Sequence, residues 1–201
     1  MVAVGVVDTG FRDNHPMFEG RAVHHLELSA SGSWHGTAVS AIILDLAPKA
    51  ELFVATGRLD SHDELRKALL WLEDKPIQIL NLSFAYRDRD LTATGLLGRQ
   101  HDRGTLIFCA RSSRLKFPWS EEFAIPCDGS WLPDSRNVML SPPDYLTVRG
   151  TSFSTAYASG VAARLLSDNP GLSRDELLNA VGSYHGNEPD AGIRTDVVLR
   201  L

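Results

Sequence analysis

Cysteine is scarce in this chain of 201 residues, which has only Cys109 and Cys127. Two cysteines do not make the disulfide framework of a small secreted domain, so we expect two buried thiols. No apolar run is long enough to span a membrane. The apolar stretch 2–7 lacks the basic leader and cleavage site of a signal peptide, which favours a cytoplasmic protein.

A basic tract interleaved with aromatic residues is also missing, and the net charge is −5. We therefore expect no nucleic acid among the partners. No His-Glu-x-x-His or paired-cysteine spacing is present, so we expect no metal and no other cofactor. A metal site of Asp8, His15, His24 and His25 is a minor alternative. It is weak because adjacent His24 and His25 would point to opposite faces of a strand.

The composition that remains is that of a globular protein, with 43% hydrophobic and 22% charged residues, and predicts one domain over residues 1–201. Apolar runs predict strands, and amphipathic stretches predict helices, two of them with capping boxes at Ser61–Glu64 and Ser173–Glu176. The alternation predicts an α/β fold, a three-layer doubly wound, mostly parallel sheet with helices on both faces. The expected strands are 2–7, 51–55, 77–84 and 105–110, and the expected helices include 37–46, 92–103 and 152–166.

Three short motifs place an aspartate, a histidine and a serine where strands end or helices begin. Asp8 lies in Val-Asp-Thr-Gly, His35 in His-Gly-Thr and Ser152 in Gly-Thr-Ser. Carboxylate, imidazole and hydroxyl are the groups of a nucleophilic acyl-transfer triad. Taken singly, each residue is equally well explained as a turn aspartate or a helix cap. All three in one chain, in this order and on this fold, favour catalysis.

The motifs resemble those of the subtilisin-like serine protease family, which has the same Asp, His, Ser order. The segments Ala47-Pro48, Leu80-Asn81-Leu82-Ser83 and Asn169-Pro170 extend the resemblance over nearly the whole chain. It implies a subtilisin-like fold and endopeptidase activity through an acyl-enzyme. In that reaction Ser152 attacks a peptide carbonyl, His35 transfers the proton and Asp8 orients the imidazole.

The resemblance also implies where a peptide or protein substrate binds. An extended chain would lie as an added strand between two walls. The first wall is Ser83, Phe84, Ala85 and Tyr86, with Arg111 beside it, and the second is Arg58 and Leu59. The bulk of Ala85 and Tyr86, where the family has paired glycines, predicts a narrow pocket for a dedicated substrate.

The chain departs from the family at the oxyanion hole. The family has an asparagine donor there, whereas this chain has Ser112, preceded by Arg111 in place of glycine. The backbone N–H of Ser152 would supply the other donor. Arg111 or Arg114 would replace the lost donor, unless this loop is only a solvated basic turn.

The chain also resembles a minimal catalytic core of this family, without an inhibitory pro-segment. An active protease of that kind needs another restraint, either narrow specificity or an activating or recognition partner protein. A pseudo-protease that binds a peptide and turns over little is the alternative function, and the altered oxyanion loop favours it.

Overall fold

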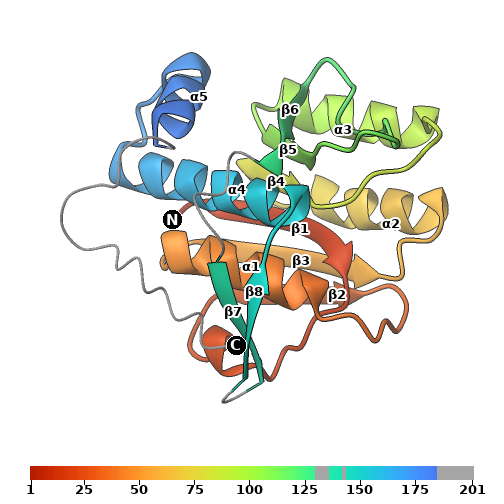
Figure 1. The fold of residues 1–201 in the computed structure, drawn as a ribbon. Helices are drawn as coiled ribbons and strands as arrows, with labels where there is room; N and C mark the ends of the chain where they lie inside the picture. Colours follow the sequence, from red (N-terminus) through yellow and green to blue (C-terminus); the bar gives the residue numbers. More distant parts are fainter. Residues whose placement is uncertain (130–135, 142–143, 185–201) are drawn as a thin grey trace.

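Six parallel strands form the central sheet, in the order β2-β3-β1-β4-β5-β6 (Figure 1). The computed structural model describes residues 1–129, 136–141 and 144–184. The chain adds strands to one side of β1 before it adds β4 to the other, and ligand sites of α/β sheets lie at such reversals. The strands are β1 (Ala3–Thr9), β2 (Val23–Glu27), β3 (Glu51–Gly57), β4 (Ile79–Leu82), β5 (Leu106–Ala110) and β6 (Ala124–Cys127).

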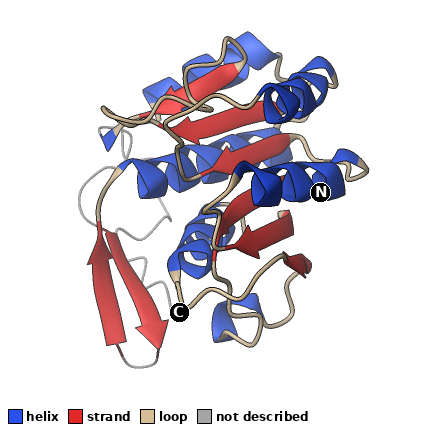
Figure 2. Cartoon of the chain, turned by 90° about the vertical axis from the view of Figure 1, so that its right-hand side faces the viewer, coloured by secondary structure: helices blue, strands red, loops and turns tan. Residues whose placement is uncertain are grey.

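Helices cover both faces of this sheet, as Figure 2 shows. On one face, α1 (His35–Leu46) and α4 (Thr151–Asp168) share a core with the sheet, and α5 (Arg174–Ser183) packs on α4. On the other face lie α2 (His62–Glu73) and α3 (Leu91–Asp102). These layers confirm the predicted α/β architecture. The remaining elements are the 3-10 turn η1 (Pro16–Phe18) and the antiparallel hairpin of β7 (Arg136–Ser141) and β8 (Asp144–Val148).

The close approach of α1 and α4 depends on small side chains. A Cβ added to Gly160 of α4 would lie 2.9 Å from Cδ1 of Leu46 and 3.2 Å from the backbone of Ile43, both in α1. Ala156 and Ala158 of α4 are fully buried in the same core. Because these two helices begin at His35 and Thr151, their packing brings the N-terminus of one close to that of the other.

Some predicted elements need correction. Strand β2 was not predicted, because its His-His-Leu-Glu segment is neither an apolar run nor a clean alternation, and it lies at the sheet edge. The predicted capping box at Ser61 is wrong, since Ser61 makes no side-chain cap bond. Glu64 instead accepts hydrogen bonds from the Leu59 N–H at 2.6 Å and the Ser29 hydroxyl at 2.5 Å. The box formed by Ser173 and Glu176 is confirmed.

The two cysteines are free and buried, as predicted, but they lie on opposite faces of the sheet. Cys109 of β5 belongs to the core under α2 and α3, and Cys127 of β6 belongs to the core under α1 and α4. In the register of these strands Cys127 pairs with Ala110, one residue beyond Cys109, so the two side chains point apart. Among the described helices, none has both the length and the apolar character to cross a membrane.

Candidate active site

Asp8 and His35 form a short hydrogen bond at the carboxyl end of β1. His35 Nδ1 lies 2.6 Å from Asp8 Oδ1, which also accepts the backbone N–H of Thr9 at 2.6 Å. Asp8 is buried, whereas the His35 side chain keeps 23% of its surface exposed. Burial works against the charged imidazolium, but the charge and hydrogen bond of Asp8 outweigh it and raise the pKa of His35. This geometry orients the ring and favours proton uptake by it.

Glycines allow the first turn of α1 to lie against the end of β1. A Cβ on Gly36 would lie 2.6 Å from the carbonyl oxygen of Gly10 and 3.1 Å from Cβ of Asp8. Gly10 has φ +65°, and a Cβ there would lie 2.0 Å from the carbonyl oxygen of Ser33. The Ser33 hydroxyl accepts the backbone N–H of His35 at 3.1 Å. The His-Gly-Thr motif therefore sets the position of the imidazole.

Two aromatic rings flank the imidazole. The Phe153 ring lies 5.1 Å from His35, and the Trp34 ring lies 6.4 Å from it, measured between ring centroids. Trp34 and Phe153 are themselves nearly parallel, at 8° and 6.2 Å. Phe153 follows Ser152 on α4, so this contact brings the histidine and serine motifs to the same place.

Ser152 is bonded to the end of β4. Its hydroxyl donates to the backbone carbonyl of Ser83 at 2.9 Å, and the Ser83 hydroxyl donates to the carbonyl of Ser152, also at 2.9 Å. Ser152 is half-buried, one residue past the Thr151 that begins α4. Between the described side chains of His35 and Ser152 no hydrogen bond forms, because the hydroxyl is turned toward Ser83.

A buried polar chain runs from this point into the core. Asn81 of β4 donates through Nδ2 to the Ser83 hydroxyl at 2.9 Å, and its Oδ1 accepts from the Ser159 hydroxyl at 3.2 Å. Asn81 and Ser159 have no exposed surface. Buried polar groups that satisfy one another specify one arrangement, and here they fix the start of α4 against β4.

Comparisons with known sequences find similarity to subtilisin-like proteases. The subtilase family matches residues 131–183, which include Ser152 and all of α4. A curated relative, the subtilisin-like protease het-Q2 of Podospora anserina, is 34% identical over 92 residues, which are 41% of this chain and 24% of that protein. The match thus spans about a quarter of the relative's length.

Solved structures share the fold over most of the chain. The prenylagaramide maturation protease PagA superposes with a TM-score of 0.72 at 23% identity, over 89% of this chain and 80% of that one. Sphericase gives 0.68 at 18% identity, over 89% of this chain and 81% of that one. The chain has a subtilisin-like fold.

The loop after β5 carries the residues predicted for the oxyanion hole, and their side chains contact other residues of the 111–119 segment. The Ser112 hydroxyl accepts the backbone N–H groups of Arg114 at 3.3 Å and Leu115 at 3.2 Å. Arg111 stacks on Trp119, with its guanidinium carbon 5.5 Å from the ring centroid. Among the described residues, neither side chain is hydrogen-bonded to Ser152, so their predicted oxyanion roles stay predictions.

The two predicted walls of the subtilisin-like cleft are joined by Tyr86. Its phenol donates to the Leu59 carbonyl at 2.9 Å and approaches the Ser61 carbonyl at 3.3 Å. Its backbone N–H and carbonyl are already paired with the 116–117 segment, as an isolated antiparallel bridge to Phe117. Burial, followed by the charges of Glu64 and Asp60, raises the pKa of the Tyr86 phenol, so it remains a donor. Because the backbone of Tyr86 is already paired, a peptide that binds along the segment after β4 has only residues 83–85 as backbone partners.

The remaining predicted wall residues belong either to the segment after β4 or to the segment after β3. Phe84 and Ala85 are half-buried after β4, and the Phe84 ring packs edge-on against Tyr86 at 5.4 Å. Opposite, Arg58 is exposed and pairs with Asp60 at 3.5 Å, and Leu59 is buried with φ +52°.

The histidines of the alternative metal site are separated by their partners. His25 pairs with Asp13 at 2.7 Å, and His24 pairs with Glu51 at 2.9 Å on the stacked ring of Phe53. Asp8 is engaged with His35. In the part of the chain that the structure describes, no three histidine, cysteine or acidic side chains are grouped to hold a metal ion.

Sequence reasoning missed several residues that shape the site. Asn81 was noticed only as part of a resembling strand, although a polar residue in the middle of an apolar strand is a signal for a buried network. Trp34 and Trp119 gave no signal, because a single tryptophan in a loop has no periodic pattern that predicts its contact with His35 or Arg111.

Proposed function

We propose that this chain is a serine endopeptidase that acts through Asp8, His35 and Ser152. Ser152 Oγ attacks the substrate carbonyl as His35 takes its proton, and the collapse of the tetrahedral intermediate releases the amine, which His35 protonates. Water then attacks the acyl-enzyme ester, again with His35 as the base, and releases the acid and free Ser152. Asp8 orients the imidazole and stabilises the imidazolium.

The observation that carries this proposal is the 2.6 Å contact between His35 and Asp8, formed where α1 meets the N-terminus of α4. A buried carboxylate that orients a partly exposed imidazole next to a serine at a helix N-terminus is the arrangement that acyl transfer requires. The family match over residues 131–183 supports the same role for Ser152. The N-terminus of α4 also favours negative charge beside Ser152.

We propose a dedicated peptide or protein as the substrate. The phenol of Tyr86, bonded across the cleft to Leu59, limits the room for side chains along residues 83–86. Solved structures with the same fold include a prenylagaramide maturation protease and a lanthipeptide protease. For this chain we propose one specific peptide as the substrate. Narrow selectivity for one peptide would restrain proteolysis of other proteins, with or without a partner protein.

Labelling with a fluorophosphonate probe tests the proposal. We expect covalent labelling of the wild-type chain, none of Ser152→Ala, and strongly reduced labelling of His35→Ala. Ser183→Ala is the matched control, since Ser183 is an exposed helical serine whose hydroxyl bonds only to the Asn179 carbonyl within α5. Labelling that survives Ser152→Ala would refute the assigned nucleophile.

A peptide-binding pseudo-protease is the second candidate. Two observations favour it: the Ser152 hydroxyl bonds to Ser83 and not to His35, and the Ser112 hydroxyl is used within its own loop. This candidate predicts peptide binding without Ser152-dependent labelling. The same experiment therefore separates the two functions.

A further inference from the structure

The first six residues after β5 carry positive charge and no carboxylate. Residues 111–116 read Arg-Ser-Ser-Arg-Leu-Lys, and Arg111, Arg114 and Lys116 are all exposed. The chain as a whole has a net charge of −5, so three cations within six residues are a local reversal of sign. Such a concentration attracts anionic groups.

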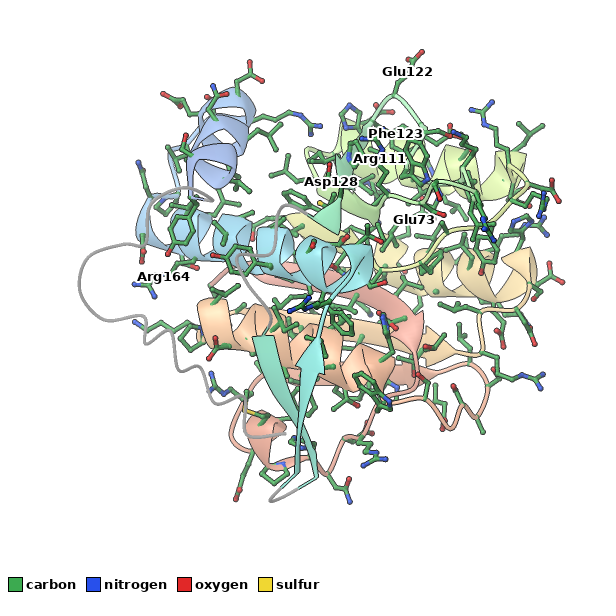
Figure 3. All side chains as sticks on the ribbon, viewed as in Figure 1. Glu73, Arg111, Glu122, Phe123, Asp128 and Arg164 are labelled. Atoms are coloured by element: carbon green, nitrogen blue, oxygen red, sulfur yellow. The ribbon has the colours of Figure 1, made fainter. Side chains whose placement is uncertain are left out.

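The sheet register puts this loop at the edge where the proposed active site lies. Leu82 of β4 pairs with Cys109 of β5, so the residues that come next, Ser83 and the start of the loop, leave the sheet side by side. Ser83 is hydrogen-bonded to Ser152. The backbone N–H of Arg111 continues the pairing with β6 by donating to the Cys127 carbonyl at 2.9 Å. Figure 3 shows Arg111 at this end of β5 and β6.

A single indole holds two of the cations close together. The Arg111 guanidinium carbon lies 5.5 Å and the Lys116 Nζ lies 4.9 Å from the centroid of Trp119. Trp119 is itself fixed, because its Nε1–H donates to the Leu115 carbonyl at 2.6 Å. The two charges therefore lie within about 10 Å of each other, about the Debye length at 0.1 M salt. A carboxylate that binds beside both cations reduces their mutual repulsion.

Several arginines elsewhere on the described surface pair with carboxylates, whereas these three cations form no ion pair with a described carboxylate. Arg66, Arg89 and Arg99 pair with Asp90, Glu121 and Glu73. Within the described ranges, no carboxylate forms an ion pair with Arg111, Arg114 or Lys116. Of the acidic residues that follow, Glu121 is taken by Arg89, and Glu122 projects outward (Figure 3).

We propose that Arg111 and Lys116, held on Trp119 and assisted by Arg114, bind a carboxylate side chain of the substrate peptide close to the bond that Ser152 attacks. The inference rests on the proposed peptide substrate and adds its chemical class: a segment with Asp or Glu beside the reacting carbonyl. A guanidinium presents a planar pair of donors to a carboxylate, and the ammonium adds a second charge. Three cations are too few for the phosphate contacts that a nucleic acid needs.

Binding to the Ser152→Ala variant tests this without requiring turnover. The probes are fluorescent octapeptides in a positional set, in which one position at a time carries Glu, Gln or Lys. We expect Glu to bind about fivefold more tightly than Gln at one or two adjacent positions, as for an exposed ion pair. Raising the salt concentration to 0.5 M should remove most of this preference, because the pair is screened.

Variants then assign the preference to the loop. On the Ser152→Ala background, Arg111→Gln with Lys116→Gln should abolish the Glu preference, and Arg111→Lys alone should retain most of it. Lys49→Gln with Lys67→Gln is the control of equal charge change, since both lysines are exposed, Lys49 in the turn before β3 and Lys67 in α2, and this pair of changes should leave the preference intact.

Three results would overturn the proposal: equal binding of the Glu and Gln peptides at every position, no binding of any peptide, or a Glu preference that the loop variants leave unchanged. Loss of the proposed protease activity gives a different result. In that case the wild-type chain is not labelled by the fluorophosphonate, yet the Glu preference of Ser152→Ala is still observed.

Discussion

Ser83 and Ser152 exchange two hydrogen bonds, each hydroxyl donating to the backbone carbonyl of the other residue at 2.9 Å. This pair ties the end of β4 to the start of α4 and turns the Ser152 hydroxyl away from His35. A substrate N–H that bonds to the Ser83 carbonyl competes with that hydroxyl. Peptide binding and release of the nucleophile toward the imidazole are therefore linked through one carbonyl oxygen.

Ser83→Ala tests the contribution of this pair. The change removes the donor to the Ser152 carbonyl and leaves Nδ2 of Asn81 without an acceptor. We expect fluorophosphonate labelling to slow by about tenfold, the effect of about 1.4 kcal/mol. Labelling rates and thermal unfolding measure the two effects separately. Ser159→Ala, which cuts the same chain farther from Ser152, should lower stability but slow labelling less; equal slowing by both would assign the loss to general destabilisation.

The pH dependence of peptide hydrolysis should report His35. Asp8 raises the pKa of His35 above its ordinary 6.5, and only the neutral imidazole accepts the Ser152 proton. We therefore expect kcat/KM to rise with pH through an inflection above pH 6.5. Activity should be lost at pH values below that inflection, where His35 is protonated. In Asp8→Asn the inflection should move down and turnover should fall by about 10⁴-fold, as in the chymotrypsin-type triad. An unmoved inflection would show that another group sets it.

Ser112→Asn tests the oxyanion position. The present hydroxyl accepts N–H groups of its own loop, whereas an asparagine amide can accept with its oxygen and donate with its nitrogen. We expect turnover to rise by about tenfold or more with little change in KM, because a single such donor has a large effect in subtilisin itself. Steady-state kinetics on one peptide measure this. A fall in turnover would mean that the present loop has its own working geometry.

Tyr86→Phe tests the bridge across the cleft. Loss of the phenol breaks the bond to the Leu59 carbonyl and frees the two walls to separate. We expect a wider range of peptides to be cleaved, chiefly through lower KM for bulky side chains, with a stability loss of about 1 kcal/mol. A peptide library compared between the two proteins measures the change. An unchanged profile would show that other contacts hold the walls together.

The sequence was sufficient for the parts of the fold that have strong local patterns. Buried apolar strands such as β1 and the small-residue helix α4 are recognisable from residue type alone, and so is the Ser173 capping box. Strand β2 was missed because its pairing with β3, and not its own composition, makes it a strand. Glu64 was misassigned because two distant donors, Ser29 and Leu59, compete successfully for its carboxylate.

At the candidate site, short motifs identified the residues but not their partners. The Asp-Thr-Gly and His-Gly-Thr motifs led to Asp8 and His35, whose contact follows from strand and helix ends meeting at one edge of the sheet. The orientation of the Ser152 hydroxyl and the stacking of Arg111 on Trp119 depend on tertiary packing. No local pattern encodes them.

The sheet also keeps the thiols of Cys109 and Cys127 apart, and this decides whether they can form a disulfide. Burial raises the pKa of Cys127 to about 12 and that of Cys109 well above its ordinary value, so both remain protonated at neutral pH. They lie on adjacent strands, but their side chains face different apolar layers. A disulfide between these two thiols therefore does not form in the folded chain, and none contributes to its stability.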